Sequence, residues 1–178
     1  IYNNKDYMKK IKGSKLMYSR NNQECLPVSL RTYFERETEE IVLLFSCDMV
    51  DKRIIDRIIE WNSKTPIKLY VGDSFKTSGL SADNLNSMRW MYDASITDYR
   101  NIKVIPTRND VHAKLILLKN QQTVFVSSQN LTVSSWQSLL EAGVISEERN
   151  EFQDLYDSIK SLERSGLSKI ESGNLEET

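Results

Sequence analysis

The hydrophobic positions of the chain fall into short continuous runs that alternate with stretches of helical spacing. A continuous apolar run of strand length occupies residues 41–46, and predominantly apolar runs at residues 66–71 and 101–106 also predict strands. A continuous run is typical of a strand buried on both faces. Between the first two runs, apolar residues recur at helical spacing from Val50 to Trp61, and residues 48–51 supply capping side chains. This order predicts a βαβ unit, right-handed by default, with two parallel strands.

Other segments complete the expected element order. Residues 1–15 predict a loosely held arm or an edge strand, and helices are expected from Pro27 to about Thr38 and over residues 81–94. Residues 148–164 predict an amphipathic terminal helix. We therefore expect one domain over residues 1–164, an α/β fold in which helices flank both faces of a mixed, mainly parallel central sheet. Residues 165–178 are polar and acidic and predict a flexible tail.

Residues 111–145 combine apolar runs with polar side chains at fixed spacing. The first run, residues 111–118, carries His112, the only histidine, and Lys114. On a strand, this spacing directs both side chains to the same face. A polar turn at residues 119–122 and a second strand at residues 123–127 predict an antiparallel return, which brings Ser128, Gln129 and Asn130 level with His112 and Lys114. A third apolar run, residues 139–145, carries Glu141.

These residue types predict a phosphate-handling site. The Lys114 ammonium suits non-bridging oxygens, the Asn130 amide can donate to another, and Ser128 adds a hydroxyl or a backbone donor. Glu141 could accept a hydrogen bond from the second ring nitrogen of His112 and fix its tautomer. The imidazole is then poised to attack phosphorus.

Each of these residues also has a structural interpretation. A lone histidine is often a satisfied structural residue, Lys114 alone would be a surface charge, and Asn130 alone would be a turn residue. Glu141 could lie at the exposed face of a strand. Arg108, in the loop before His112, is either a solvated charge or a clamp on a substrate phosphate.

The combined pattern resembles a known family. His112-Ala113-Lys114, then Ser127-Ser128-Gln129-Asn130 and Glu141, resembles the motif of the phospholipase D superfamily, which begins His-x-Lys and continues with a Gly/Ser-rich turn ending in Asn. The resemblance is strongest to its small single-motif endonucleases, which include a metal-independent restriction enzyme. Two departures stand out. The motif's Asp, five residues after the Lys, is Lys119 here, although some nuclease members also lack it, and the turn starts with Ser127 in place of Gly.

The resemblance implies a metal-independent phosphodiesterase that works through a phosphohistidine intermediate. One imidazole cannot act both as nucleophile and as leaving-group acid in a single in-line step. A single histidine per chain therefore favours a symmetric homodimer that brings two copies of His112 together. Lys114 and Asn130 of both subunits would stabilise the transition state.

Composition limits the remaining possibilities. The 178 residues, 39% hydrophobic and 28% charged, suit one globular domain. A net charge of −1 means that any phosphate-binding face is a local patch.

One histidine with Cys25 and Cys47 cannot supply a zinc tetrahedron, so we expect no metal and no cofactor. No apolar run approaches the roughly 20 residues that span a bilayer, so we expect a cytoplasmic protein without a membrane partner. The chain starts with Ile1, which leaves a removed signal peptide open.

The favoured function is an endonuclease, with DNA preferred over RNA as the nucleic-acid partner, in a restriction or defence role. One alternative is a catalytically impaired phospholipase D-like module that binds nucleic acid, which the departures at Lys119 and Ser127 motivate. Another is a phospholipase or other phosphodiesterase. It would need an apolar entrance near residues 74–79, which that sequence does not obviously supply.

Overall fold

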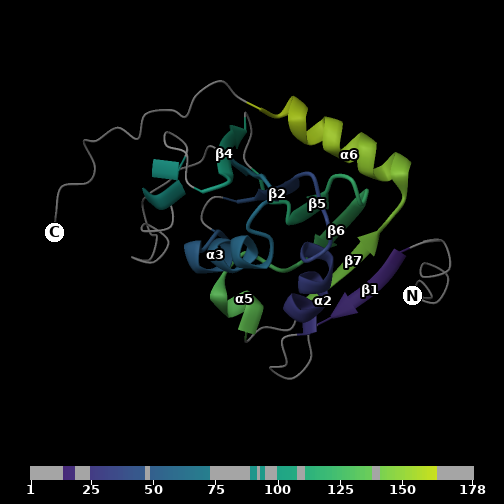
Figure 1. Cartoon of the computed structure of the whole chain (residues 1–178). Coiled ribbons are helices and arrows are strands. Elements are labelled where there is room, and N and C mark those ends of the chain that lie inside the picture. The colour runs from purple at the N-terminus through teal and green to yellow at the C-terminus, as the bar shows by residue number, and fades with distance from the viewer. Residues whose placement is uncertain are drawn as a thin grey trace, which may run out of the picture.

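The computed structural model describes residues 14–18, 25–46, 49–72, 89–91, 93–94, 100–107, 111–137 and 141–163. Its helices and strands form one layer of sheet with helices on both sides (Figure 1). In chain order they are β1 (Ser14–Tyr18), α2 (Cys25–Phe34), β2 (Ile41–Phe45), α3 (Lys52–Trp61), β3 (Ile67–Gly72), β4 (Ile102–Thr107), β5 (Leu115–Leu118), β6 (Thr123–Ser127), α5 (Val133–Gln137), β7 (Ala142–Ser146) and α6 (Arg149–Ser161).

The strands form a seven-stranded sheet in the order β1-β7-β6-β5-β2-β3-β4. β2, β3 and β4 are parallel neighbours, whereas the pairs β1–β7, β7–β6, β6–β5 and β5–β2 are antiparallel. Only β5 and β7 therefore run against the other five strands. The predicted α/β fold with a mixed, mainly parallel sheet is confirmed, and so is the β2-α3-β3 unit with parallel strands.

Two hydrophobic clusters cover the two faces of the sheet. On one face, α2, α3 and α5 pack over alternate residues of the strands, and Trp136 of α5 stacks on Trp61 of α3 at 5.6 Å between ring centroids. On the other face, α6 packs against the sheet and buries Phe152 and Ile159 (Figure 1). Trp136 is 2% exposed, so it is a packing residue of this cluster.

Several element bounds differ from the sequence expectations. The helix expected from Pro27 to about Thr38 is α2, which ends at Phe34, and β1 forms an edge strand on β7. The strand expected from residue 111 begins only at Leu115. Leu115 pairs with Leu44 near the end of β2, and beyond Phe45 the chain leaves the sheet, so the preceding residues have no partner on that side. Most of the expected helix at 81–94, and the tail at 165–178, lie outside the described residues.

Candidate active site

The residues singled out from the sequence meet at one end of the sheet. β2 ends where β5 begins, because Leu44 pairs with Leu115. β6 ends at the same level, and β7 starts beside it, because Ser127 pairs with Gly143. Lys114, Ser128 and Glu141 each lie within a residue of these strand ends, and His112 and Asn130 lie within three. The carboxyl ends of the parallel strands β2 and β3 point to the same end, which is where α/β proteins commonly bind ligands.

His112 and Lys114 project to the same side of the chain. Val111, Ala113 and Leu115, which alternate with them, pack against the hydrophobic cluster beneath α6. The two polar side chains are therefore directed away from α6, as their spacing predicts. His112 is exposed, and its imidazole forms no hydrogen bond with the described part of the chain. Lys114 is half-buried, and its Nζ donates to the carbonyl oxygen of His112 at 3.3 Å.

Hydrogen bonds at the end of β6 fix the turn of residues 127–130 that follows this strand. The Ser127 N–H donates to the Lys114 carbonyl at 3.2 Å, which extends the β5–β6 ladder by one residue. The Ser127 hydroxyl accepts from the Gln129 N–H at 3.1 Å. The Ser128 N–H donates to the Ala142 carbonyl at 2.9 Å. Lys114 and the serine turn therefore lie on neighbouring strands, as the antiparallel return predicts.

Glu141 has other hydrogen-bond partners than the one expected from the sequence. The side chain is 6% exposed, and its two carboxylate oxygens accept from different hydroxyls: Ser135 Oγ at 2.9 Å and Ser128 Oγ by a short hydrogen bond. The predicted hydrogen bond from the His112 ring to Glu141 is not formed among the described residues. The reason is geometric, since the carboxylate is buried beside α5 whereas the imidazole faces solvent.

Asn130 occupies a short connection that is fixed on both sides. Val50 and Leu131 form a parallel bridge, in which the Asp51 N–H donates to Leu131 O at 2.7 Å and the Leu131 N–H donates to Met49 O at 3.1 Å. The Asn130 Oδ1 is buried and has no hydrogen-bond partner within the described ranges. An unpaired buried acceptor commonly costs about 1–3 kcal/mol. An amide oxygen only accepts, so a phosphate oxygen would have to bind the Nδ2 donor of Asn130.

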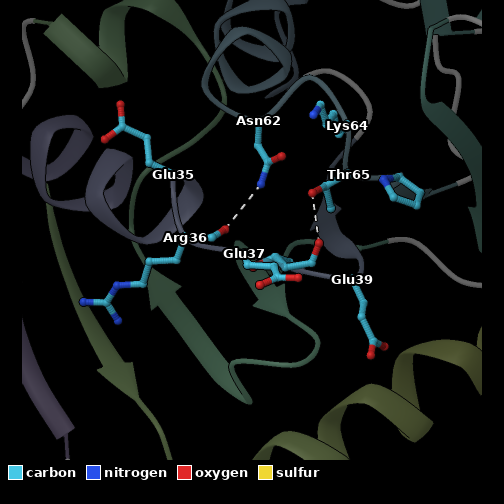
Figure 2. A pocket seen from close by; sticks show the side chains of 9 residues that line it. Glu35, Arg36, Glu37, Glu39, Asn62, Lys64 and Thr65 are labelled. Carbon is cyan, nitrogen blue, oxygen red and sulfur yellow. Dashed lines mark hydrogen bonds between the residues drawn. The ribbon is translucent and has the colours of Figure 1, made fainter.

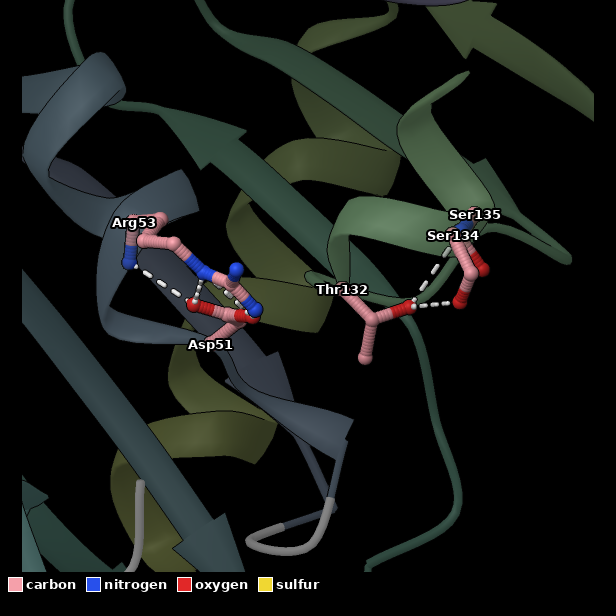
Figure 3. A network of polar contacts seen from close by, with 5 residues as sticks. All are labelled: Asp51, Arg53, Thr132, Ser134 and Ser135. Atoms are coloured by element: carbon pink, nitrogen blue, oxygen red, sulfur yellow. Dashed lines mark hydrogen bonds and ion pairs between the residues drawn. The ribbon is translucent and has the colours of Figure 1, made fainter. Parts of the chain in front are cut away.

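Two helix caps lie next to this bridge (Figure 3). Asp51 caps α3 by accepting from the Arg53 N–H at 2.9 Å, and its carboxylate also pairs with the Arg53 guanidinium at 2.6 Å. Burial by itself raises the pKa of Asp51, but the hydrogen bonds and charge of Arg53 outweigh burial and hold that pKa below its ordinary value. Thr132 caps α5, because its hydroxyl accepts from the Ser135 N–H at 3.3 Å. Each of the two bridged residues, Val50 and Leu131, is thus followed by a capped helix.

The remaining sequence candidates lie away from this cluster or outside the described residues. Arg108 is outside them, so its role as a phosphate clamp stays a prediction. Lys119 follows β5 at the end opposite to Lys114, and its ammonium pairs with Glu39 at 3.5 Å. The departure from the family motif at Lys119 therefore does not reach the site. Within the described ranges, no three His, Cys, Asp or Glu side chains are grouped as metal ligands.

A cavity of about 470 Å³ lies at the opposite end of the sheet (Figure 2). Its lining comes from the segments that precede β2 and β3 and includes Glu35, Asn62 and Lys64. The Asn62 amide donates to the Phe34 carbonyl at 2.9 Å, and the Thr65 hydroxyl donates to the Thr38 carbonyl at 2.9 Å. These polar groups hold the two connections together. The cavity is therefore separate from the end of the sheet that carries His112.

The fold and this end of the sheet define an α/β protein in which an imidazole, an ammonium, hydroxyls and an amide gather where strands end. The family model for the PLD-like domain of cardiolipin synthase matches residues 36–162. This match spans more than half of the chain, and the chain belongs to the phospholipase D superfamily. Members of this superfamily are phosphodiesterases and related hydrolases.

Solved structures with the same fold support this assignment. NucT from Helicobacter pylori has a TM-score of 0.61 and 12% identity, over 84% of this chain and 94% of that one. The phospholipase D family member Nuc from Salmonella typhimurium has a TM-score of 0.62 and 15% identity, over 87% of this chain and 98% of that one. The archaeal chromatin protein TrmBL2, described with a novel mode of DNA binding, has a TM-score of 0.50 and 11% identity, over 87% and 53% of the two chains.

At these identities the likeness shows a shared fold. No curated protein sequence matches the chain significantly. Among the helices that the structure describes, none is both long enough and apolar enough to cross a membrane.

Proposed function

We propose that this chain is a metal-independent phosphodiesterase that cleaves nucleic acid, DNA in preference to RNA, at a site formed by two copies of the chain. The observation that carries the proposal is the juxtaposition at the start of β5. An exposed imidazole, His112, is followed two residues later by Lys114, and Lys114 is joined by backbone hydrogen bonding to the serine turn that leads to Asn130. A nucleophile, a fixed cation and an amide are thereby within one small surface.

The chemistry follows from the groups present. A neutral His112 ring nitrogen attacks phosphorus, and the bond to the leaving oxygen breaks as a second imidazole donates a proton to that oxygen. The second imidazole then removes a proton from water, which attacks the phosphohistidine and releases the phosphate product. Each chain has one histidine, so the second imidazole is His112 of the partner subunit. The exposure of His112 suits this arrangement, because an imidazole sealed within one subunit could not meet its counterpart.

Lys114 and the amide nitrogen of Asn130 stabilise the charge that develops on the phosphorus oxygens, whereas both donors of Ser128 are already bound to the Ala142 carbonyl and to Glu141. One such donor is commonly worth about 3 kcal/mol of transition-state stabilisation. The backbone next to Asn130 is held by the Leu131 bridge, so the side-chain Nδ2 loses little freedom when it donates to a phosphate oxygen. Nucleic acid is the favoured substrate because the exposed site suits an extended polymer, and a structure of the same fold is described as binding DNA.

The test is cleavage of a DNA duplex and of a single strand in EDTA. We expect the wild-type protein to cut in the presence of the chelator, and His112→Ala to lower the rate by roughly three orders of magnitude or more, since it removes the nucleophile. A phosphorylated His112 trapped in a single turnover would identify the intermediate. Cleavage by the His112→Ala protein at the wild-type rate would end the proposal.

Lys114 and Lys119 offer a matched pair of variants on either side of β5. Lys114→Met should lower the rate about a hundredfold, whereas Lys119→Met, at the far end of the strand, should leave it within about twofold of wild type. Equal losses in both variants would indicate a general effect of charge on nucleic-acid binding. Tight oligonucleotide binding without any turnover would identify the impaired binding module instead.

A further inference from the structure

We infer that Ser135, together with Glu141, is a positioning residue for the Asn130 connection, and this inference rests on the proposed function. Ser135 belongs to α5 and does not reach the end of β5 where His112 lies. Its influence passes through the buried Glu141 carboxylate, which is held by Ser135 on one oxygen and by Ser128 on the other. We call Ser128, Ser135 and Glu141 the serine–glutamate clamp.

The clamp links the two ends of the connection between β6 and α5. Ser128 lies just after β6, and Ser135 lies within α5, so one carboxylate ties both ends of the segment that contains Asn130. The Gln129 side chain, 3% exposed, reinforces this closure by donating from Nε2 to the Ser135 carbonyl at 3.3 Å. Thr132 completes it by accepting from the Ser135 N–H. Ser135 therefore contacts the segment through its hydroxyl, its N–H and its carbonyl.

Burial makes this arrangement energetically significant. Glu141 and Ser135 are 6% and 2% exposed, so water does not readily replace a lost partner. Hydrogen bonds to an ionised carboxylate are about twice as strong as neutral ones. Removing the Ser135 hydroxyl would take a buried donor from the carboxylate, and the restraint that Glu141 places on Ser128 would weaken.

A shift of Ser128 would reach Asn130 directly, because only Gln129 separates them. On the other side, the Leu131 bridge to Met49 and Asp51 holds the backbone in place. The Asn130 amide is thus set by two restraints, the bridge and the clamp. This assigns Glu141 a role through the serines in addition to, or in place of, the contact with His112 expected from the sequence.

The experiment compares Ser135→Ala with Ser134→Ala. The neighbouring Ser134 is exposed, shares a hydrogen bond with Thr132 at 3.2 Å and does not belong to the clamp, so it is a matched control in the same helix. Two readouts are measured: amide hydrogen exchange at Gln129 and Leu131, and kcat and KM for DNA cleavage. Exchange requires no turnover, so it tests the clamp even if the proposed function fails.

For Ser135→Ala we expect exchange at Gln129 and Leu131 to be about tenfold faster, because the closed segment opens more often. We also expect kcat to fall about tenfold with KM within about twofold, as for loss of an interaction made in the transition state. Ser134→Ala should resemble wild type in both readouts. In a Glu141→Gln background, Ser135→Ala should have a much smaller further effect, since the two residues act as one unit.

Thr and Val variants at position 135 keep the test decisive if Ser135→Ala does not fold. Their side chains have nearly the same shape, and only threonine retains the hydroxyl, so Ser135→Thr should preserve the wild-type exchange and kcat that Ser135→Val loses. Equal behaviour of the two variants, or unchanged exchange in Ser135→Ala, would overturn the clamp. Faster exchange with an unchanged kcat would overturn its catalytic part. Absence of turnover in the wild-type protein would contradict the proposed function alone.

Discussion

At the residue scale, Ser127 stands where the family motif has a glycine, and the residue opposite it on the neighbouring strand is itself a glycine. Ser127 of β6 stands opposite Gly143 of β7. A Cβ at Gly143 would lie 2.9 Å from the Ser127 Cβ, from the Phe125 ring and from the Val126 carbonyl oxygen. Real Cβ atoms do not approach backbone this closely, so the serine at 127 is accommodated because position 143 has no side chain. The Ser127 hydroxyl then contributes to the turn by accepting from Gln129.

This pair predicts that Gly143→Ala destabilises the protein. We expect the free energy of unfolding to fall by about 1–3 kcal/mol, the usual cost of overpacking a filled site. The measurement is urea denaturation at constant m-value. Ala142→Gly is the neighbouring control, because Ala142 is exposed and its change should cost only about 0.5–1 kcal/mol through backbone entropy. A Gly143→Ala midpoint equal to that of wild type would show that β7 shifts freely at this position.

At the element scale, the Leu131 bridge connects the starts of α3 and α5. Asp51 takes part in the bridge through its N–H and caps α3 through its carboxylate, which is also paired with Arg53. A single residue thus links the cap of one helix to the segment that carries Asn130. Loss of the Asp51 charge should therefore lower the free energy of unfolding, by an amount that depends on pH.

The pKa of Asp51 is lowered in the folded protein, so the unfolded chain binds the proton at higher pH than the folded chain does. The contribution of its charge is therefore complete above the unfolded pKa, about 3.9, and is lost as pH falls through the folded pKa. Asp51→Asn keeps a good cap. We expect it to be less stable than wild type by about 1 kcal/mol or less near pH 6, because Arg53 is largely exposed.

The difference between the two proteins should shrink toward zero near pH 2, which denaturant titrations at several pH values would measure. A difference that stays constant from pH 2 to pH 6 would show that the cap geometry, and not the charge, accounts for it.

At the scale of the whole molecule, each chain would supply one half of the proposed active site. The sheet brings His112, Lys114 and the Asn130 connection to one end, and His112 faces solvent there. With a net charge of −1, the chain has no general attraction for nucleic acid. Local pairing of two such ends would concentrate two imidazoles and two lysines around one phosphate.

Mixed dimers test this arrangement. When equal amounts of wild-type and His112→Ala chains are exchanged, only dimers with two wild-type chains contain both the nucleophile and the acid. Activity should then fall to about a quarter of that of the wild-type protein alone, whereas independent subunits would retain about half. Light scattering would report the dimer itself. A linear loss of activity with the His112→Ala fraction would place the whole reaction within one chain.

The sequence by itself determined the elements and the residues at their ends. Apolar runs of strand length identified β2 and β3, helical spacing identified α3 and α6, and the turn after β5 identified the antiparallel return to β6. These features depend on local periodicity, which reports the face that a segment buries. The spacing of His112 and Lys114 belongs to the same kind of information, and the observed alternation with Val111 and Ala113 agrees with it.

Only the tertiary structure decided which polar groups meet. α5 has five residues, too few for a clear helical period, so neither the helix nor the approach of Ser135 to Glu141 could be inferred. The start of β5 depended on where β2 leaves the sheet, seventy residues earlier in the chain. The hydrogen-bond partner of a buried carboxylate depends on how distant segments pack together, and spacing along the sequence does not reveal that packing. For that reason the residues near the site were predictable, and the hydrogen bonds of Glu141 were not.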